Sequence, residues 1–148
     1  MFQIQNINPR IGNYLAGFAD GEGSFMIVVR KREDYAKKWK ISLCFNVSQK
    51  ESYILSQFKK HLQCGTLRKR KDGVWYFEVN NFNSIYNNVI PFFTKFNFLS
   101  QNKKKQFMLF KKAAQVIKDE KHLTNEGFEK ILQIRKEMNR GGKRKNLC

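Results

Sequence analysis

The sequence predicts an α+β fold, with one four-stranded antiparallel sheet, helices on a single face of it, and the core order αββαββα. Three patterns carry this prediction. Apolar and polar residues alternate over 24–32 and 39–48, the period of half-buried strands. The pair Asp72-Gly73 separates two further alternating runs, which is a strong hairpin signal. Apolar residues at helical spacing occupy the segments between and after these strands.

The first half of the chain supplies the sheet. Residues 1–12 are expected to form a leading loop, with Pro9 and Gly12 as breakers. The remaining elements alternate helix and strand pair, and their expected ranges are a helix at 13–22, strands at 24–32 and 39–48, a helix at 51–62, and hairpin strands at 66–70 and 74–80.

The second half is predominantly helical. A helix at 83–90 is expected to break at Pro91, and the run 91–99 reads as an aromatic loop that fills the core. Helices follow at 102–119 and 124–138, and the second opens at Thr124 with Glu126 behind it. The chain is expected to be one domain over 1–148, with 141–148 as a loose basic tail.

Strand alternation assigns the two faces of the sheet. One face is apolar and points to the core: Phe25, Ile27, Val29, Ile41, Leu43, Phe45 and Val47. The other face is polar, basic and expected to be open. A sheet face that only meets solvent would look equally polar. The strands at 24–32 and 39–48, however, carry no Asp or Glu, which favours a binding face.

The charge balance points to a polyanionic partner. The 148 residues include 29 Lys and Arg against 12 Asp and Glu, a formal net charge of +17. The sequence has no apolar run of about 18 residues and no Lys-rich helix with a clean apolar face, so nucleic acid is favoured over a membrane surface.

The segment 14–25, YLAGFADGEGSF, organises the rest of the chain. Gly17 and Gly21 stand four apart and leave a bare stripe on a helix, where a second helix can approach closely. Asp20 and Glu22 lie at the C-terminus of the helix, where the negative end of its dipole destabilises carboxylates. A cationic partner such as a divalent metal would offset this cost.

This segment resembles the LAGLIDADG motif of homing endonucleases over Leu15 to Gly23, with apolar, small and acidic replacements at Phe18, Ala19, Gly21 and Glu22. The resemblance implies a Mg²⁺-dependent, site-specific double-strand DNA endonuclease of intron homing, which cuts a long pseudo-palindromic site by metal-activated water. An RNA maturase of the same fold, with its host intron RNA as partner, is the alternative, and a DNA-binding module without activity is a third.

The same resemblance implies roles for individual residues. Glu22 and the carbonyl of Gly21 would bind the metal, and Gln49 would orient metal-bound water. Lys103, or alternatively Lys104, would raise the reactivity of the water or steady the charged phosphate. A plain basic loop at Lys103 and a turn residue at Gln49 are the simpler interpretations. One motif in a chain of this length implies a homodimer paired through Leu15, Gly17, Phe18 and Gly21.

The open sheet face would then lie along the DNA. A strand of eight residues spans about 26 Å, or about 8 base steps. Residues expected to contact DNA are Ser24, Met26, Val28, Arg30, Arg32, Lys40, Ser42, Cys44, Asn46, Thr66, Arg68, Arg70, Tyr76 and Glu78. The composition, with 14 Phe but 2 Pro, favours A/T-rich codons and, together with the resemblance, an organelle (mitochondrion or chloroplast).

Overall fold

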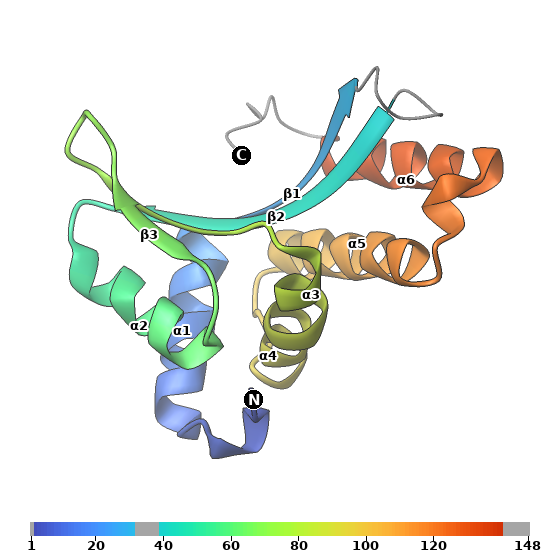
Figure 1. The fold of residues 1–148 in the computed structure, drawn as a ribbon. Helices are drawn as coiled ribbons and strands as arrows, with labels where there is room; N and C mark the ends of the chain where they lie inside the picture. Colours follow the sequence, from blue (N-terminus) through green and yellow to red (C-terminus); the bar gives the residue numbers. More distant parts are fainter. Residues whose placement is uncertain (1, 32–38, 141–148) are drawn as a thin grey trace.

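The computed structural model describes residues 2–31 and 39–140 as one curved sheet with helices packed beneath it (Figure 1). The four strands are β1 (Gly23–Lys31), β2 (Trp39–Gln49), β3 (Thr66–Lys69) and β4 (Trp75–Val79). They are antiparallel in the order β1-β2-β4-β3. The predicted α+β class and antiparallel sheet are therefore confirmed.

The helical elements account for the rest of the described chain. The longer helices are α1 (Pro9–Glu22), α2 (Ser52–Leu62), α5 (Gln101–Lys118) and α6 (Asn125–Met138). The shorter ones are η1 (Ile4–Asn6), α3 (Phe82–Ser84), the π turn η2 (Ile85–Val89), α4 (Ile90–Lys95) and η3 (Lys121–Leu123). None of the described helices is long and apolar enough to cross a membrane.

Both prolines were expected to act as breakers, and this expectation is wrong. Each lies in the first turn of a helix, where proline is tolerated. Pro9 occupies the first position of α1, where its missing N–H would have no intrahelical partner, and the Asn8 side chain accepts from the N–H of Arg10. Pro91 lies in the first turn of α4, directly after the wider π turn η2. The expected loop 91–99 is therefore helical as far as Lys95.

Phenylalanine dominates the core between the sheet and the helices. The ring of Phe25 lies within 6 Å, centroid to centroid, of five others: Phe45, Phe93, Phe98, Phe107 and Phe110. Phe93 and Phe98 come from the segment expected to fill the core, so that part of the prediction is confirmed. The apolar strand face is also confirmed, since Phe25, Ile27, Leu43, Phe45 and Val47 are 3% exposed or less and Val29 and Ile41 pack against the core.

Gly12 is required by close packing of α1 on the aromatic segment. A Cβ at this position would stand 2.3–2.5 Å from the ring atoms of Phe96, and Phe96 is itself only 2% exposed. Gly12→Ala is expected to lower the free energy of unfolding by about 1–3 kcal/mol through overpacking. Urea unfolding at fixed protomer concentration measures it.

A second substitution isolates that clash. Phe96→Leu removes ring atoms and, as a single substitution, should destabilise the protein. Combined with Gly12→Ala, it should lower the free energy of unfolding by less than the sum of the two single losses. If the two losses of unfolding free energy add exactly, the destabilisation by Gly12→Ala does not come from contact with the Phe96 ring.

Candidate functional site

The C-terminus of α1 meets the start of α5 and one end of the sheet, and the residues of the motif lie at this junction (Figure 1). Glu22 and Gly21 are exposed at the last turn of α1. A Cβ at Gly23 would approach the carbonyl oxygen of Ala19 to 2.8 Å, so glycine lets the chain turn tightly from helix into β1.

Gln49 reaches the same end of the sheet from β2. Gly23 pairs with Val47, so Gln49 lies two residues beyond the point where β1 begins. By alternation it shares the helix-covered face with Val47. Its Oε1 accepts from the N–H of Lys50 at 2.8 Å, which is the contact expected of a turn residue.

Lys103 is brought to the motif by the first turn of α5. Its side chain is buried, with 7% exposed, and its Nζ donates a hydrogen bond to the carbonyl oxygen of Gly23. Lys104 and Lys105 are exposed on α5. Of the three lysines in the run, Lys103 is thus the one in contact with the end of the motif.

Asp20, the first acid of the motif, has a role that the sequence did not reveal. Its Oδ2 accepts from the N–H groups of Leu99 and Ser100, both at 3.1 Å, and its Oδ1 accepts from Ser100 Oγ at 2.5 Å. Burial alone would raise the pKa of Asp20, but these bonds and the charge of Lys103 hold the pKa below its usual value. No local pattern could have found this, because the partners lie about 80 positions away.

The remaining acid, Glu22, can contribute to a metal site only together with other oxygen donors. Among the described residues no three His, Cys, Asp or Glu side chains gather where they could hold a metal ion. Glu22 and the adjacent backbone carbonyl are hard oxygen donors of the kind that Mg²⁺ and Ca²⁺ take. The donor set of one chain therefore fits a divalent cation in type and is incomplete in number.

The outer face of α1 is open in this protomer. At Gly17 and Gly21 an added Cβ would have no neighbour within 4 Å, and Tyr14 is 63% exposed on the same stripe. Leu15, in contrast, is 1% exposed within the core, and the Phe18 ring lies 6.1 Å from Phe58. Leu15 therefore does not lie on the outer face expected to pair with a partner, because one residue along a helix is a rotation of about 100°, which turns Leu15 from the side of Tyr14 into the core.

The outer sheet face is basic at its ends and closely packed at its centre. Ser24 and Ser42 are half-buried, and Arg30, Lys40, Thr66 and Arg68 are exposed. Five expected contact residues are 7% exposed or less: Met26, Val28, Cys44, Asn46 and Tyr76. The expectation that the whole face is open is wrong there. The sheet is curved, with its concave side away from the helices (Figure 1). On a concave face neighbouring side chains lean toward one another, which accounts for the burial of these five. Arg32 lies outside the described residues.

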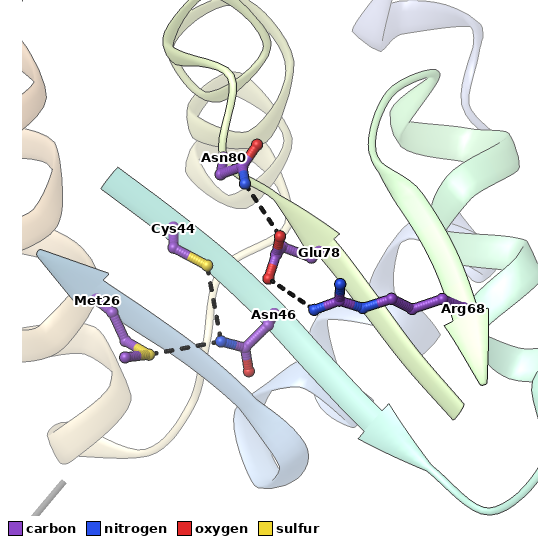
Figure 2. A network of polar contacts seen from close by, with 6 residues as sticks. All are labelled: Met26, Cys44, Asn46, Arg68, Glu78 and Asn80. Atoms are coloured by element: carbon purple, nitrogen blue, oxygen red, sulfur yellow. Dashed lines mark hydrogen bonds and ion pairs between the residues drawn. The ribbon is translucent and has the colours of Figure 1, made fainter. Parts of the chain in front are cut away.

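A polar network crosses this concave face (Figure 2). Asn46 Nδ2 lies 3.5 Å from Met26 Sδ and 3.8 Å from Cys44 Sγ. On β4, Glu78 accepts from Asn80 Nδ2 at 3.0 Å and lies 3.7 Å from an Nη of Arg68. Glu78 thus ties β3 to β4 and restrains one arginine.

The two hairpin arginines frame Tyr76. The guanidinium carbons of Arg68 and Arg70 lie 5.1 and 5.9 Å from the Tyr76 ring centroid, within cation–π range. Burial, with the nearby charge of Glu78, raises the pKa of Tyr76 to about 12, so its hydroxyl stays protonated. Arg70 also pairs with Asp72 of the turn at 3.1 Å. Both arginines are therefore held over the concave face.

Comparison with known proteins agrees with this geometry. Residues 15–114 match the family model described as LAGLIDADG endonuclease. The chain is 31% identical over 147 residues to probable intron-encoded endonuclease 2 of Neurospora crassa, an alignment that covers 94% of this chain and 31% of that protein. The chain spans about a third of the length of the curated relatives it matches.

Solved structures share the fold. The homing endonuclease I-TnaI superposes with a TM-score of 0.82 at 28% identity, covering 92% of this chain and 90% of that one. I-SmaMI bound to an uncleaved DNA target in the presence of calcium ions gives the same score and identity over 93% of this chain and 47% of that one. The family match spans most of the described chain, including α1 from Leu15 onward, the whole sheet and most of α5. The chain belongs to the LAGLIDADG endonuclease family.

Proposed function

We propose that this chain is a Mg²⁺-dependent, site-specific endonuclease of intron homing that cuts both strands of DNA as a homodimer. One observation carries the proposal. The exposed carboxylate of Glu22 shares one junction with Gln49 and the buried Lys103, at the end of a sheet whose opposite face is basic. Organellar expression is proposed with it, since relatives are named for introns and the composition favours A/T-rich codons.

The residues at the junction have separable tasks. Glu22 and the Gly21 carbonyl would hold Mg²⁺, which when bound activates water and stabilises the leaving 3′-oxygen. Gln49 would orient the attacking water through its side-chain amide. Lys103 would place its positive charge beside the phosphate.

Homodimer formation would complete the metal site. Among the described residues of this junction, the Asp20 carboxylate is bound by Leu99 and Ser100, so Glu22 is the acid left for a metal. Pairing through Gly17 and Gly21 would bring the two Glu22 side chains near a two-fold axis. Two nearby carboxylates repel each other, and divalent cations offset that repulsion. The two sheets would then lie end to end along a long, nearly palindromic site, and cleavage would leave short 3′ overhangs.

The direct test is cleavage of a plasmid that carries the intron-less target. We expect a linear product with Mg²⁺, none with EDTA, and retention of DNA binding in both. A plasmid without the target should stay intact. Binding without cleavage at any Mg²⁺ concentration would refute the proposed activity.

Arg68 is expected to read a base. If it pairs bidentately with a guanine, Arg68→Ala should cost about 1–3 kcal/mol of binding free energy and relax preference at one position in each half-site. A matrix of base substitutions in the target measures this. Lys69→Ala is the matched control, because Lys69 is the next residue on β3 and faces the other way. Equal weakening at all targets would mean that Arg68 contacts phosphate.

A further inference from the structure

The two metal-ligand positions lie inside a closed set of contacts between α1 and α5. Asp20 precedes them and binds the segment Leu99–Ser100 through three hydrogen bonds of 2.5–3.1 Å. Gly23 follows them, and its carbonyl accepts from Lys103 Nζ. Gly21 and Glu22 are therefore flanked on both sides by contacts to the N-terminal end of α5 and the two residues before it.

Ser100 connects the two ends of this set. Its hydroxyl donates to Asp20 Oδ1 at 2.5 Å and accepts from the N–H of Lys103 at 3.2 Å, as the N-cap of α5. One side chain thus fixes the backbone of Lys103 against the last turn of α1. The Asp20 carboxylate is thus linked to the backbone of Lys103 by two hydrogen bonds in series, of 2.5 and 3.2 Å.

An ordinary helix cap would not need this arrangement. Ser100 alone satisfies the free N–H of Lys103, as Thr124 does for α6 with Gly127 at 3.0 Å. Here the cap is itself bound by a carboxylate 80 positions earlier, and the capped turn sends a buried lysine back to the same segment. The electrostatics agree, because Asp20 also adds a negative charge at the positive end of the α5 dipole.

We propose that Asp20 and Ser100 are positioning residues for DNA cleavage, which act by holding Lys103 beside the metal-ligand pair Gly21 and Glu22. The inference rests on the proposed function, and specifically on the role proposed there for Lys103. Misplacement of a reacting group by about 1 Å can cost about 100-fold in rate. Loss of the hydrogen bonds made by Asp20 and Ser100 should therefore slow cleavage and leave DNA affinity close to that of the wild type.

A double-mutant cycle tests the inference. Single-turnover cleavage of the plasmid target with Mg²⁺ is measured for Asp20→Ala, Lys103→Ala and the double variant, with DNA affinity measured separately in Ca²⁺. We expect Asp20→Ala to slow cleavage by about 10–100-fold, and the double variant to be no slower than Lys103→Ala. A double variant slowed by the product of the two single effects would overturn the inference, because Asp20 would then act independently of Lys103.

Ser100 supplies a second arm should Asp20→Ala fail to fold. Ser100→Ala removes the hydroxyl and should reproduce the slow cleavage, whereas Ser100→Thr keeps it and should restore the rate. Equal rates for the two variants would contradict the proposal.

Thr124→Ala serves as the structural control, since it removes a cap of the same kind from α6. It should lower the melting temperature but leave cleavage below that temperature unchanged. If it slows cleavage as much as Asp20→Ala does, general loss of stability explains both and the inference fails.

The cycle also separates the inference from the function beneath it. Full cleavage by Lys103→Ala would overturn the role proposed for Lys103, and the positioning inference with it. Slow cleavage by Lys103→Ala together with wild-type rates for Asp20→Ala and Ser100→Ala would overturn the positioning inference alone.

Discussion

Glu22→Gln is expected to reduce DNA cleavage to background while the protein still binds its target. Glu22 is the exposed acid at the last turn of α1, and a neutral amide is a far poorer ligand for a hard divalent cation than a carboxylate. Binding should persist because the substitution leaves the basic sheet face proposed to contact DNA unchanged and does not lower the net charge of +17. The measurement is plasmid linearisation over a Mg²⁺ titration, paired with target binding in EDTA.

A matched control separates the ligand from its charge. Glu129→Gln makes the same change in net charge on the exposed surface of α6, away from the junction, and should cut at the wild-type rate. Wild-type cleavage by Glu22→Gln would place the metal site elsewhere. Loss of cleavage by both variants would show that the effect follows overall charge, which is not expected for a ligand.

The sheet was predictable because its signals are local. Alternation over β1 and β2 gave the inward face, and Asp72-Gly73 gave the turn between β3 and β4, with Gly73 at a positive φ of 88°. The start of α6 was equally visible, since Thr124 accepts from the N–H of Gly127 at the expected N-cap. Each of these features depends on residues within a few positions of one another.

The prolines show where local signals were ambiguous. A proline breaks a helix interior but fits its first turn, and the sequence alone does not state which position it occupies. Pro9 and Pro91 both lie at the first turns of helices. Around Pro91 the buried aromatic residues Phe92 and Phe93 hold the segment against the core, so tertiary packing decided the conformation.

The candidate site was predictable in its parts and not in its connections. The motif gave Gly21 and Glu22, but the sequence left Lys103 and Lys104 as alternatives, and only the packing of α5 sends Lys103 to Gly23. The hydrogen bond between Asp20 and Ser100 joins residues 80 positions apart, so no local pattern predicts it. Crowding at the centre of the sheet likewise depends on curvature, which alternation does not encode.

Gly17→Leu is expected to disrupt the proposed homodimer and abolish cleavage without unfolding the protomer. A Cβ at Gly17 meets nothing within 4 Å, so the larger side chain has room in the isolated chain, and leucine is a better helix former than glycine. In a symmetric pair the clash occurs twice. At about 1–3 kcal/mol for each overpacked site, the dimer should weaken by about 2–6 kcal/mol, or roughly 30-fold to 10⁴-fold in its dissociation constant.

Sedimentation across a range of concentrations, combined with far-UV circular dichroism, distinguishes a dimerisation defect from misfolding. We expect Gly17→Leu to sediment as a folded monomer that binds DNA weakly and does not cut it, with Gly17→Ala intermediate because its side chain is smaller. Gly12→Leu should instead lose structure, since Gly12 faces the Phe96 ring inside the protomer. The contrast follows from the geometry of α1, which packs one glycine into its own core and leaves the other bare on its outer face. A Gly17→Leu variant that stays dimeric and active would move the interface off this helix, and the second Glu22 would then no longer be available to complete the metal site.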